Sequence, residues 1–196
     1  MMTFLRDRIL PRLPVGRYRD APPLVAVVRL SGVIAAPGGL MRAGLNLQSV
    51  AGVLERAFKL PRLRAVALAI NSPGGSPVQS ALIARRIRSL AIEHSVPVFA
   101  FCEDVAASGG YWLACAADEI YADAASVVGS IGVVSAGFGL DEFIRRHGIE
   151  RRIYTAGTSK AILDPFQPEK REDVERLQAL QRDIHAQFIQ HVKQRR

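Results

Sequence analysis

The chain has 196 residues, of which 49% are hydrophobic and 22% charged, and its formal net charge at pH 7 is +8. This length suits one domain with a substantial core, and the apolar fraction excludes a disordered chain. Two cysteines without metal-ligand spacing exclude a disulfide scaffold, so we expect two reduced, buried thiols. The 26 basic side chains include only four lysines, namely Lys59, Lys160, Lys170 and Lys193.

The basic surplus is spread along the chain rather than clustered. The arginine pairs fall at the ends or polar faces of predicted elements, without interleaved aromatic residues, so we expect no nucleic-acid partner. Residues 1–20 read as a basic N-terminal arm, in which the amphipathic piece 4–10 offers a peripheral contact with a membrane surface. No segment suits a signal peptide or a transmembrane helix, and we expect a cytoplasmic protein, at most peripheral to the inner membrane.

Residues 21–196 are expected to form a single domain of alternating strands and helices. Apolar runs predict strands at 24–30, 65–70, 96–101, 119–122, 132–135 and 151–154. Helical spacing predicts helices at 46–58, 77–94, 107–116, 140–147 and 169–193. The alternation predicts an α/β fold of stacked βαβ units, with a mostly parallel sheet covered on both faces and a long C-terminal helix.

Two strand-to-helix junctions indicate where chemistry would lie, because catalytic groups gather at the carboxyl ends of parallel strands. In the first, Gly74 and Gly75 let backbone N–H groups approach an anion, although an ordinary tight turn is the alternative. In the second, Ser108 begins a predicted helix among alanines and glycines, a common position for a nucleophile, with the N–H of Gly109 available to an oxyanion. The alternative is a helix N-cap serine, and Ala106 replaces the first glycine of the G-x-S-x-G elbow.

A nucleophilic serine needs a base. The four histidines lie at predicted helix ends or on the last helix, where surface or capping roles are expected, and arginine does not deprotonate. A lysine can accept a proton where burial lowers its pKa. Among the four lysines, Lys160 alone lies in a loop of small and apolar residues, 157–166, and it is the candidate base; a plain loop cation is the alternative.

Four motifs occur in order: Asn71-Ser72-Pro73-Gly74-Gly75, Ala107-Ser108-Gly109-Gly110-Tyr111, Val128-Gly129-Ser130-Ile131-Gly132-Val133 and Gly157-Thr158-Ser159-Lys160. Together they resemble the SppA-type signal peptide peptidases, which are serine proteases of the ClpP/crotonase-like fold. The resemblance implies a Ser–Lys dyad, with Ser108 as nucleophile, Lys160 as general base and Ser130 aiming the lysine amine. It places the oxyanion hole on N–H groups of Gly74, Gly75 and Gly109, and we expect no metal and no cofactor.

The resemblance further implies extended, apolar peptide substrates, such as signal-peptide or membrane-protein fragments, and a homo-oligomer whose active site is shared between subunits. The chain departs from the family pattern in having no N-terminal membrane anchor, and it stops after the long helix where the family usually continues. Three alternatives stay open: a ClpP-like Ser-His-Asp protease, a crotonase-type acyl-CoA enzyme, and a non-catalytic scaffold or membrane-partner protein on the same fold.

Overall fold

The computed structural model describes residues 22–38, 44–157 and 160–196, and the N-terminal arm predicted at 1–20 lies outside them. Two compact units are present: unit 1 is Met1–Ile131 with His191–Arg196, and unit 2 is Gly132–Gln190. The elements in chain order are β1 (Leu24–Ser31), α3 (Leu47–Phe58), β2 (Leu63–Ser72), α4 (Pro77–His94), β3 (Val98–Ala107), α5 (Gly109–Ala114), β4 (Glu119–Ala122), β5 (Val127–Gly129), α6 (Asp141–Arg146) and α7 (Arg171–Arg195).

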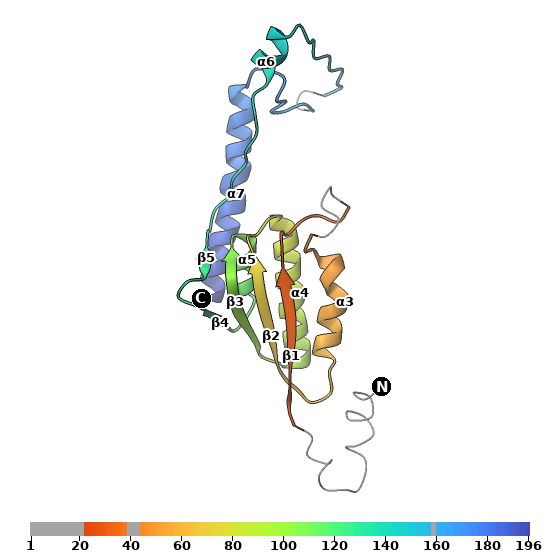
Figure 1. The fold of residues 1–196 in the computed structure, drawn as a ribbon, viewed down its shortest axis with the longest axis vertical. Helices are drawn as coiled ribbons and strands as arrows, with labels where there is room; N and C mark the ends of the chain where they lie inside the picture. Colours follow the sequence, from red (N-terminus) through yellow and green to blue (C-terminus); the bar gives the residue numbers. More distant parts are fainter. Residues whose placement is uncertain (1–21, 39–43, 158–159) are drawn as a thin grey trace. The chain divides into compact units, whose positions relative to one another are not determined.

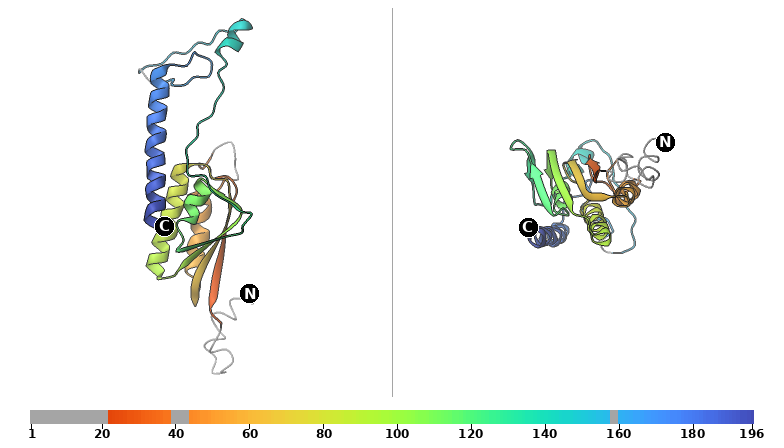
Figure 2. Two further views of the ribbon diagram at one scale, coloured as in Figure 1. Left: turned by 90° about the vertical axis from the view of Figure 1, so that its left-hand side faces the viewer. Right: turned by 90° about the horizontal axis from the view of Figure 1, so that it is seen from below.

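Unit 1 is built on a parallel sheet with the strand order β1-β2-β3-β4, and β5 pairs with the last residues of β3 (Figure 1). The central strand β2 is buried along Ala65–Ile70, as its continuous apolar run predicts. Helices α3 and α4 pack on one face of this sheet (Figure 2), and Leu54, Ile83 and Ile87 are fully buried there. The core of the chain is therefore the layer between β1–β3 and these helices.

Both helices begin and end at residues that satisfy their free backbone groups. Asn46 caps α3 through a reciprocal capping box with Ser49, and Ser76 accepts a hydrogen bond at the start of α4, where Pro77 is the first helical residue. Helix α4 ends at Ser95 in the left-handed conformation. These local signals explain why the two helices were predicted within a residue of their ends.

The prediction that both faces of the sheet are covered is wrong for this chain. On the face opposite α3 and α4, Val25 and Val27 of β1 are 58% and 67% exposed, and Phe101 of β3 stacks on Tyr121 in solvent. The reason is topological, since strands added in the order 1-2-3 by right-handed crossovers place every connecting helix on the same face. An apolar run therefore predicted β1 correctly but not its half-exposed state.

Unit 2 has less regular structure than the sequence predicts. The strands expected at 132–135 and 151–154 are irregular segments, whereas α6 and α7 form where helical spacing placed them. Along α7, Phe188 is buried but Leu180 is 56% exposed. In the described part of the chain, no helix combines the length and apolar character needed to cross a membrane.

Candidate active site

The glycine turn after β2 has a conformation that only glycine adopts without strain. Gly74 and Gly75 have φ of 96° and 141°, and a Cβ on Gly75 would lie 2.0 Å from the carbonyl oxygen of Ile34. Two backbone hydrogen bonds hold the turn, from the Ile34 N–H to the Gly74 carbonyl (2.8 Å) and from the Ser76 N–H to the Ile34 carbonyl (2.7 Å). The turn is thus a rigid backbone feature that depends on both glycines.

Ser108 occupies a strained junction between β3 and α5. Its φ of 51° and ψ of −120° lie in a region that costs a non-glycine residue of the order of 1–3 kcal/mol. Although Ser108 stands at the N-cap position, its side chain makes no capping hydrogen bond, so the N-cap alternative does not describe it. A sharp strand-to-helix turn of this kind presents a hydroxyl at the end of a sheet, which is how hydrolases expose a nucleophile.

The glycine turn lies directly against Ser108. A Cβ on Gly74 would be 2.8 Å from the Ser108 Cβ and 2.6 Å from the Gly109 nitrogen. The Gly74 N–H already donates to the Ser72 hydroxyl (3.2 Å). The N–H groups of Gly75 and of Gly109, the first residue of α5, donate to no other described residue. Gly74 therefore lies against Ser108 and Gly109, and the N–H groups of Gly109 and of Gly75, the residue after Gly74, are available.

Ser130 is tied to Ser108 through the neighbouring backbone. The Ser108 N–H donates to the carbonyl of Gly129 (2.8 Å), where β5 ends beside β3. Ser130 is exposed and also has a positive φ, of 54°. The structure thus places Ser130 one residue beyond the group that fixes the Ser108 backbone.

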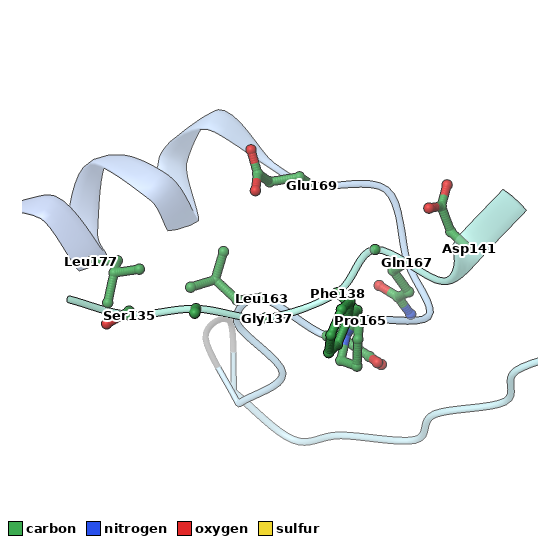
Figure 3. Close-up of a pocket in the computed structure, with 12 residues that line it drawn as sticks. Ser135, Gly137, Phe138, Asp141, Leu163, Pro165, Gln167, Glu169 and Leu177 are labelled. Atoms are coloured by element: carbon green, nitrogen blue, oxygen red, sulfur yellow. The ribbon is translucent and has the colours of Figure 1, made fainter. Parts of the chain in front are cut away.

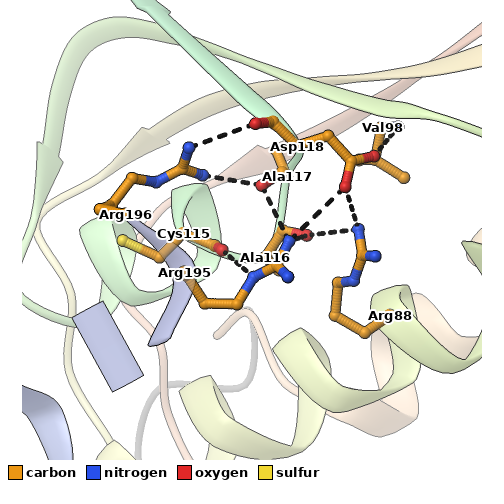
Figure 4. A network of polar contacts seen from close by, with 8 residues as sticks. All are labelled: Arg88, Val98, Cys115, Ala116, Ala117, Asp118, Arg195 and Arg196. Atoms are coloured by element: carbon orange, nitrogen blue, oxygen red, sulfur yellow. Dashed lines mark hydrogen bonds and ion pairs between the residues drawn. The ribbon is translucent and has the colours of Figure 1, made fainter. Parts of the chain in front are cut away.

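The far end of α5 is fixed by arginines from the end of the chain (Figure 4). Arg195 Nε donates to the Cys115 carbonyl (3.0 Å), and Arg196 Nη2 donates to the Ala117 carbonyl (2.7 Å). Arg88 pairs with Asp118 (2.7 Å). These cations satisfy carbonyls that a helix C-terminus leaves without intrahelical partners. The segment that begins at Ser108 is consequently anchored at both ends.

The two thiols near this helix are free and buried, as expected from the sequence. Burial raises the pKa of both Cys102 and Cys115, which keeps them protonated and unreactive at neutral pH. Arg195 and Arg196 lie close enough to Cys115 to favour its thiolate, but burial outweighs them in setting its pKa, and neither thiol is exposed as a catalytic cysteine is.

Lys160 belongs to unit 2 and lies in a turn. The side chain is exposed, as are Ala161 and Ile162. Thr158 and Ser159, which complete the predicted motif, lie outside the described residues. The described residues of unit 2 therefore do not provide the apolar enclosure expected for Lys160.

A pocket of about 380 Å³ lies within unit 2 (Figure 3). Segments 135–139 and 163–169 line it, and they are joined by a hydrogen bond from the Leu140 N–H to the Pro165 carbonyl (2.6 Å). Its walls combine Phe138 and Leu177 with the carboxylates of Asp141 and Glu169. None of the predicted catalytic residues lines it, so we assign no catalytic role to this pocket.

Sequence reasoning missed the residues that hold the site together. Ile34 pins the glycine turn through its backbone, and a backbone contact has no signal in side-chain type. Asn71 at the end of β2 hydrogen-bonds to the side chain of Asp104 and to the Val105 N–H, both on β3. In the sequence, its position next to the Ser-Pro-Gly-Gly turn is the only indication of this role.

Comparison with known proteins identifies relatives. A family model described as Peptidase family S49 matches residues 91–196. The chain is 57% identical over 195 residues to the Na(+)/H(+) antiporter NhaA of Brucella abortus, covering all of this chain and 26% of that protein. It is 34% identical over 151 residues to the chloroplastic serine protease SPPA of Arabidopsis thaliana, covering 75% of this chain and 21% of that protein.

Among solved structures, a mutant of the 1510-N membrane-bound stomatin-specific protease matches with 18% identity and a TM-score of 0.43, covering 60% of this chain and 54% of that chain. This score is too low to carry an argument by itself. The chain spans about a quarter of the length of the curated relatives named above, 26% and 21%. The α/β architecture with its parallel sheet and long C-terminal helix agrees with the ClpP/crotonase-like prediction. The family model covers more than half of the chain, which therefore belongs to peptidase family S49, as an SppA-type member.

Proposed function

We propose that the chain acts as a serine endopeptidase in which Ser108 is the nucleophile and Lys160 the general base. The observation that carries the proposal is the strained, uncapped Ser108 packed against Gly74, where the adjoining residues Gly75 and Gly109 have N–H groups with no acceptor among the described residues. Such donors stabilise the negative charge that develops on a carbonyl oxygen under attack. Membership of a peptidase family supports the reaction class.

The proposed reaction has two stages. The uncharged Lys160 amine takes the proton of the Ser108 hydroxyl while Oγ attacks the peptide carbonyl, and the oxyanion is bound by the glycine N–H groups. The lysine ammonium then protonates the leaving amine, and an acyl-enzyme remains. Water, deprotonated by the same amine, attacks the ester and releases the acid and free Ser108. Ser130 is proposed to accept a hydrogen bond from the lysine and to aim it.

The proposal includes a homo-oligomer in which a second copy covers unit 2. Val134, Phe138 and Tyr154 are each more than 80% exposed, whereas Ile144 and Phe188 are the buried large apolar side chains among the described residues of unit 2. So small a buried set does not stabilise a segment of this size on its own. Contact with a second copy would also enclose Lys160 and lower the polarity around its amine. A monomer is then expected to be inactive.

The substrates proposed are extended, apolar peptides. The glycine turn lies against Ser108, and an extended peptide binds free backbone groups of this kind by strand-like hydrogen bonding.

Labelling with a fluorophosphonate probe, followed by peptide mass mapping, tests the assignment directly. Ser108→Ala and Lys160→Ala are each expected to reduce both labelling and peptide hydrolysis by about 10³-fold or more. Ser89→Ala and Lys170→Ala are the matched controls, since both side chains are exposed and lie outside the site. Full hydrolysis by a folded Ser108→Ala chain would refute the assignment.

A second candidate is a non-catalytic partner of a membrane protein. It is favoured by the 57% identity with a segment of a protein named as an antiporter. The same probe separates the two, because a well-folded oligomer in which Ser108 stays unlabelled would favour the non-catalytic function.

A further inference from the structure

The pairing of β2 and β3 changes register immediately before both segments of the candidate site. Ile70 pairs with Cys102, but the next pair is Ser72 with Ala106, so two steps along β2 correspond to four along β3. The residues Glu103, Asp104 and Val105 thus form a bulge opposite Asn71. Bulges of this kind occur next to active sites, where they re-aim a side chain.

The side chain of Asn71 replaces the missing ladder hydrogen bonds. Its Nδ2 donates to Asp104 Oδ2 at 2.7 Å, and its Oδ1 accepts the Val105 N–H at 3.3 Å. On its other side, the Asn71 carbonyl accepts the Gly32 N–H at 2.9 Å. One residue therefore links the ends of three neighbouring strands.

Both halves of the site lie three residues beyond this link. Gly74 follows Asn71, Ser108 follows Val105, and the two segments meet where a Gly74 Cβ would lie 2.8 Å from the Ser108 Cβ. A slip of one residue along a strand moves the chain by about 3.3 Å. Donors must lie within about 2.7–3.1 Å of the oxyanion. A slip of this size would separate the hydroxyl from the N–H groups.

We propose that Asn71 and Asp104 form a positioning pair, which fixes where Ser108 lies along its strand relative to the Gly74–Gly75 turn. This inference rests on the proposed function. The pair acts through the bulge, because the contacts of the Asn71 side chain are with Asp104 and Val105 rather than with Ser108.

Exchanging the two side chains tests the proposal. In Asn71→Asp, two carboxylates face each other, and the donor to Asp104 is lost. In the double variant Asn71→Asp with Asp104→Asn, the amide and carboxylate trade places, so one oxygen at position 71 again accepts the Val105 N–H and the other accepts from position 104.

The measurement is the rate constant for acylation of Ser108 by a fluorophosphonate, with kcat and KM for a peptide substrate. Asn71→Asp is expected to slow acylation by about tenfold to a hundredfold, with kcat reduced more than KM is raised. The double variant is expected to return to within about threefold of the wild-type rate constant. The rate of amide hydrogen exchange at Val105 should rise in Asn71→Asp and fall back to the wild-type value in the double variant. This rate reports on the hydrogen bond between position 71 and the Val105 N–H independently of activity.

Three outcomes distinguish the proposals. A wild-type rate in Asn71→Asp, or a double variant as slow as Asn71→Asp with an unchanged Tm, overturns the positioning role alone. If the wild-type chain is not labelled at Ser108, the proposed function fails and the positioning role fails with it. Labelled wild type with rescue by the double variant supports both.

Discussion

Ser108 holds a backbone conformation that its own side chain disfavours. Only a few non-glycine residues in the described ranges have positive φ, and two of them, Ser108 and Ser130, follow the paired strands β3 and β5. Strain at such positions persists where surrounding contacts over-determine the backbone. Here the contacts are the Gly129 carbonyl and the tight packing of Gly74 against Ser108.

Glycine at position 108 should therefore relieve strain that alanine retains. We expect Ser108→Gly to exceed Ser108→Ala in free energy of unfolding by about 1 kcal/mol, although both lack the Ser108 hydroxyl. Urea unfolding of the two chains measures this difference. The matched pair is Ser89→Gly and Ser89→Ala in the interior of α4, where glycine should instead be the less stable by about 1 kcal/mol. If the glycine variant is less stable than the alanine variant at both positions, the backbone of Ser108 is not strained.

At this scale the sequence predicts the parts of the site that depend on residue type. Small residues around Ser108 and the paired glycines 74 and 75 indicate close backbone approach, and the structure brings these residues together. The link from Asn71 to Asp104 could not be predicted, because it depends on a register shift between two strands. The exposure of Lys160 could not be predicted either, because apolar neighbours in sequence do not enclose a side chain when, like Ala161 and Ile162, they are exposed themselves.

Helix α5 connects Ser108, the proposed nucleophile, to the end of the chain. Its first residue follows Ser108, and the carbonyls after its last turn accept hydrogen bonds from Arg195 and Arg196. On the same side, His191 stacks on Trp112 with ring centroids 4.7 Å apart. The last residues of α7 therefore stabilise the one short helix on which the position of Ser108 depends.

Removing Arg195 should loosen this anchor. Arg195→Gln loses the charged donors to the Cys115 and Ala117 carbonyls, and we expect unfolding to be easier by about 1–3 kcal/mol. Lys193→Gln, an exposed cation two residues away, is the control and should change stability by less than about 0.5 kcal/mol. Thermal unfolding of both variants tests the expectation, and equal Tm values would show that the arginine contacts do not anchor α5.

Elements were predicted where local signals and packing agree. Helices α3 and α4 have capping residues at both ends, and β2 has an uninterrupted apolar run. The strands expected at 132–135 and 151–154 did not form, because a short apolar run becomes a strand only where a sheet edge is available to pair with it. The edge of β3 pairs instead with β4 and β5.

For the whole molecule, composition predicted a substantial core but not how much apolar surface the folded chain leaves exposed. The open face of the sheet and the exposed side chains of unit 2 leave large apolar groups in solvent. Exposed apolar surface of this extent is typical of a protein–protein contact. The sequence could not predict it, because an apolar pattern is the same whether the cover comes from the same chain or from another.

Two titratable groups that lie near the last residues of α7, Asp118 and His191, make the free energy of unfolding depend on pH in different pH ranges. Burial opposes ionisation of Asp118, but the Val98 N–H and Arg88 outweigh it and hold its pKa below the usual range. A carboxylate with a depressed pKa stabilises the fold above its unfolded pKa, near 4, and loses that contribution only as pH falls further. Between pH 5 and pH 8 the Asp118 contribution is therefore constant.

His191 differs, because the unfolded pKa of a histidine, about 6.5, lies inside that window. Burial against Trp112 lowers its pKa, and Arg195 and Arg196 add to the effect, although the hydrogen bond to the Trp112 carbonyl (3.2 Å) opposes it. Below the unfolded value, about 6.5, the unfolded chain binds a proton that the folded chain resists, so stability falls as pH drops from 7 towards 5.

We therefore expect the wild-type Tm to fall over this range and His191→Gln to remove part of that fall. Glutamine retains an amide donor for the Trp112 carbonyl but has no charge to gain. Calorimetry at pH 5, 6, 7 and 8 on both chains measures the difference. His147→Gln, which changes an exposed histidine, should keep the wild-type slope. A His191→Gln chain with the same loss of Tm as the wild type would place the acid sensitivity elsewhere in the molecule.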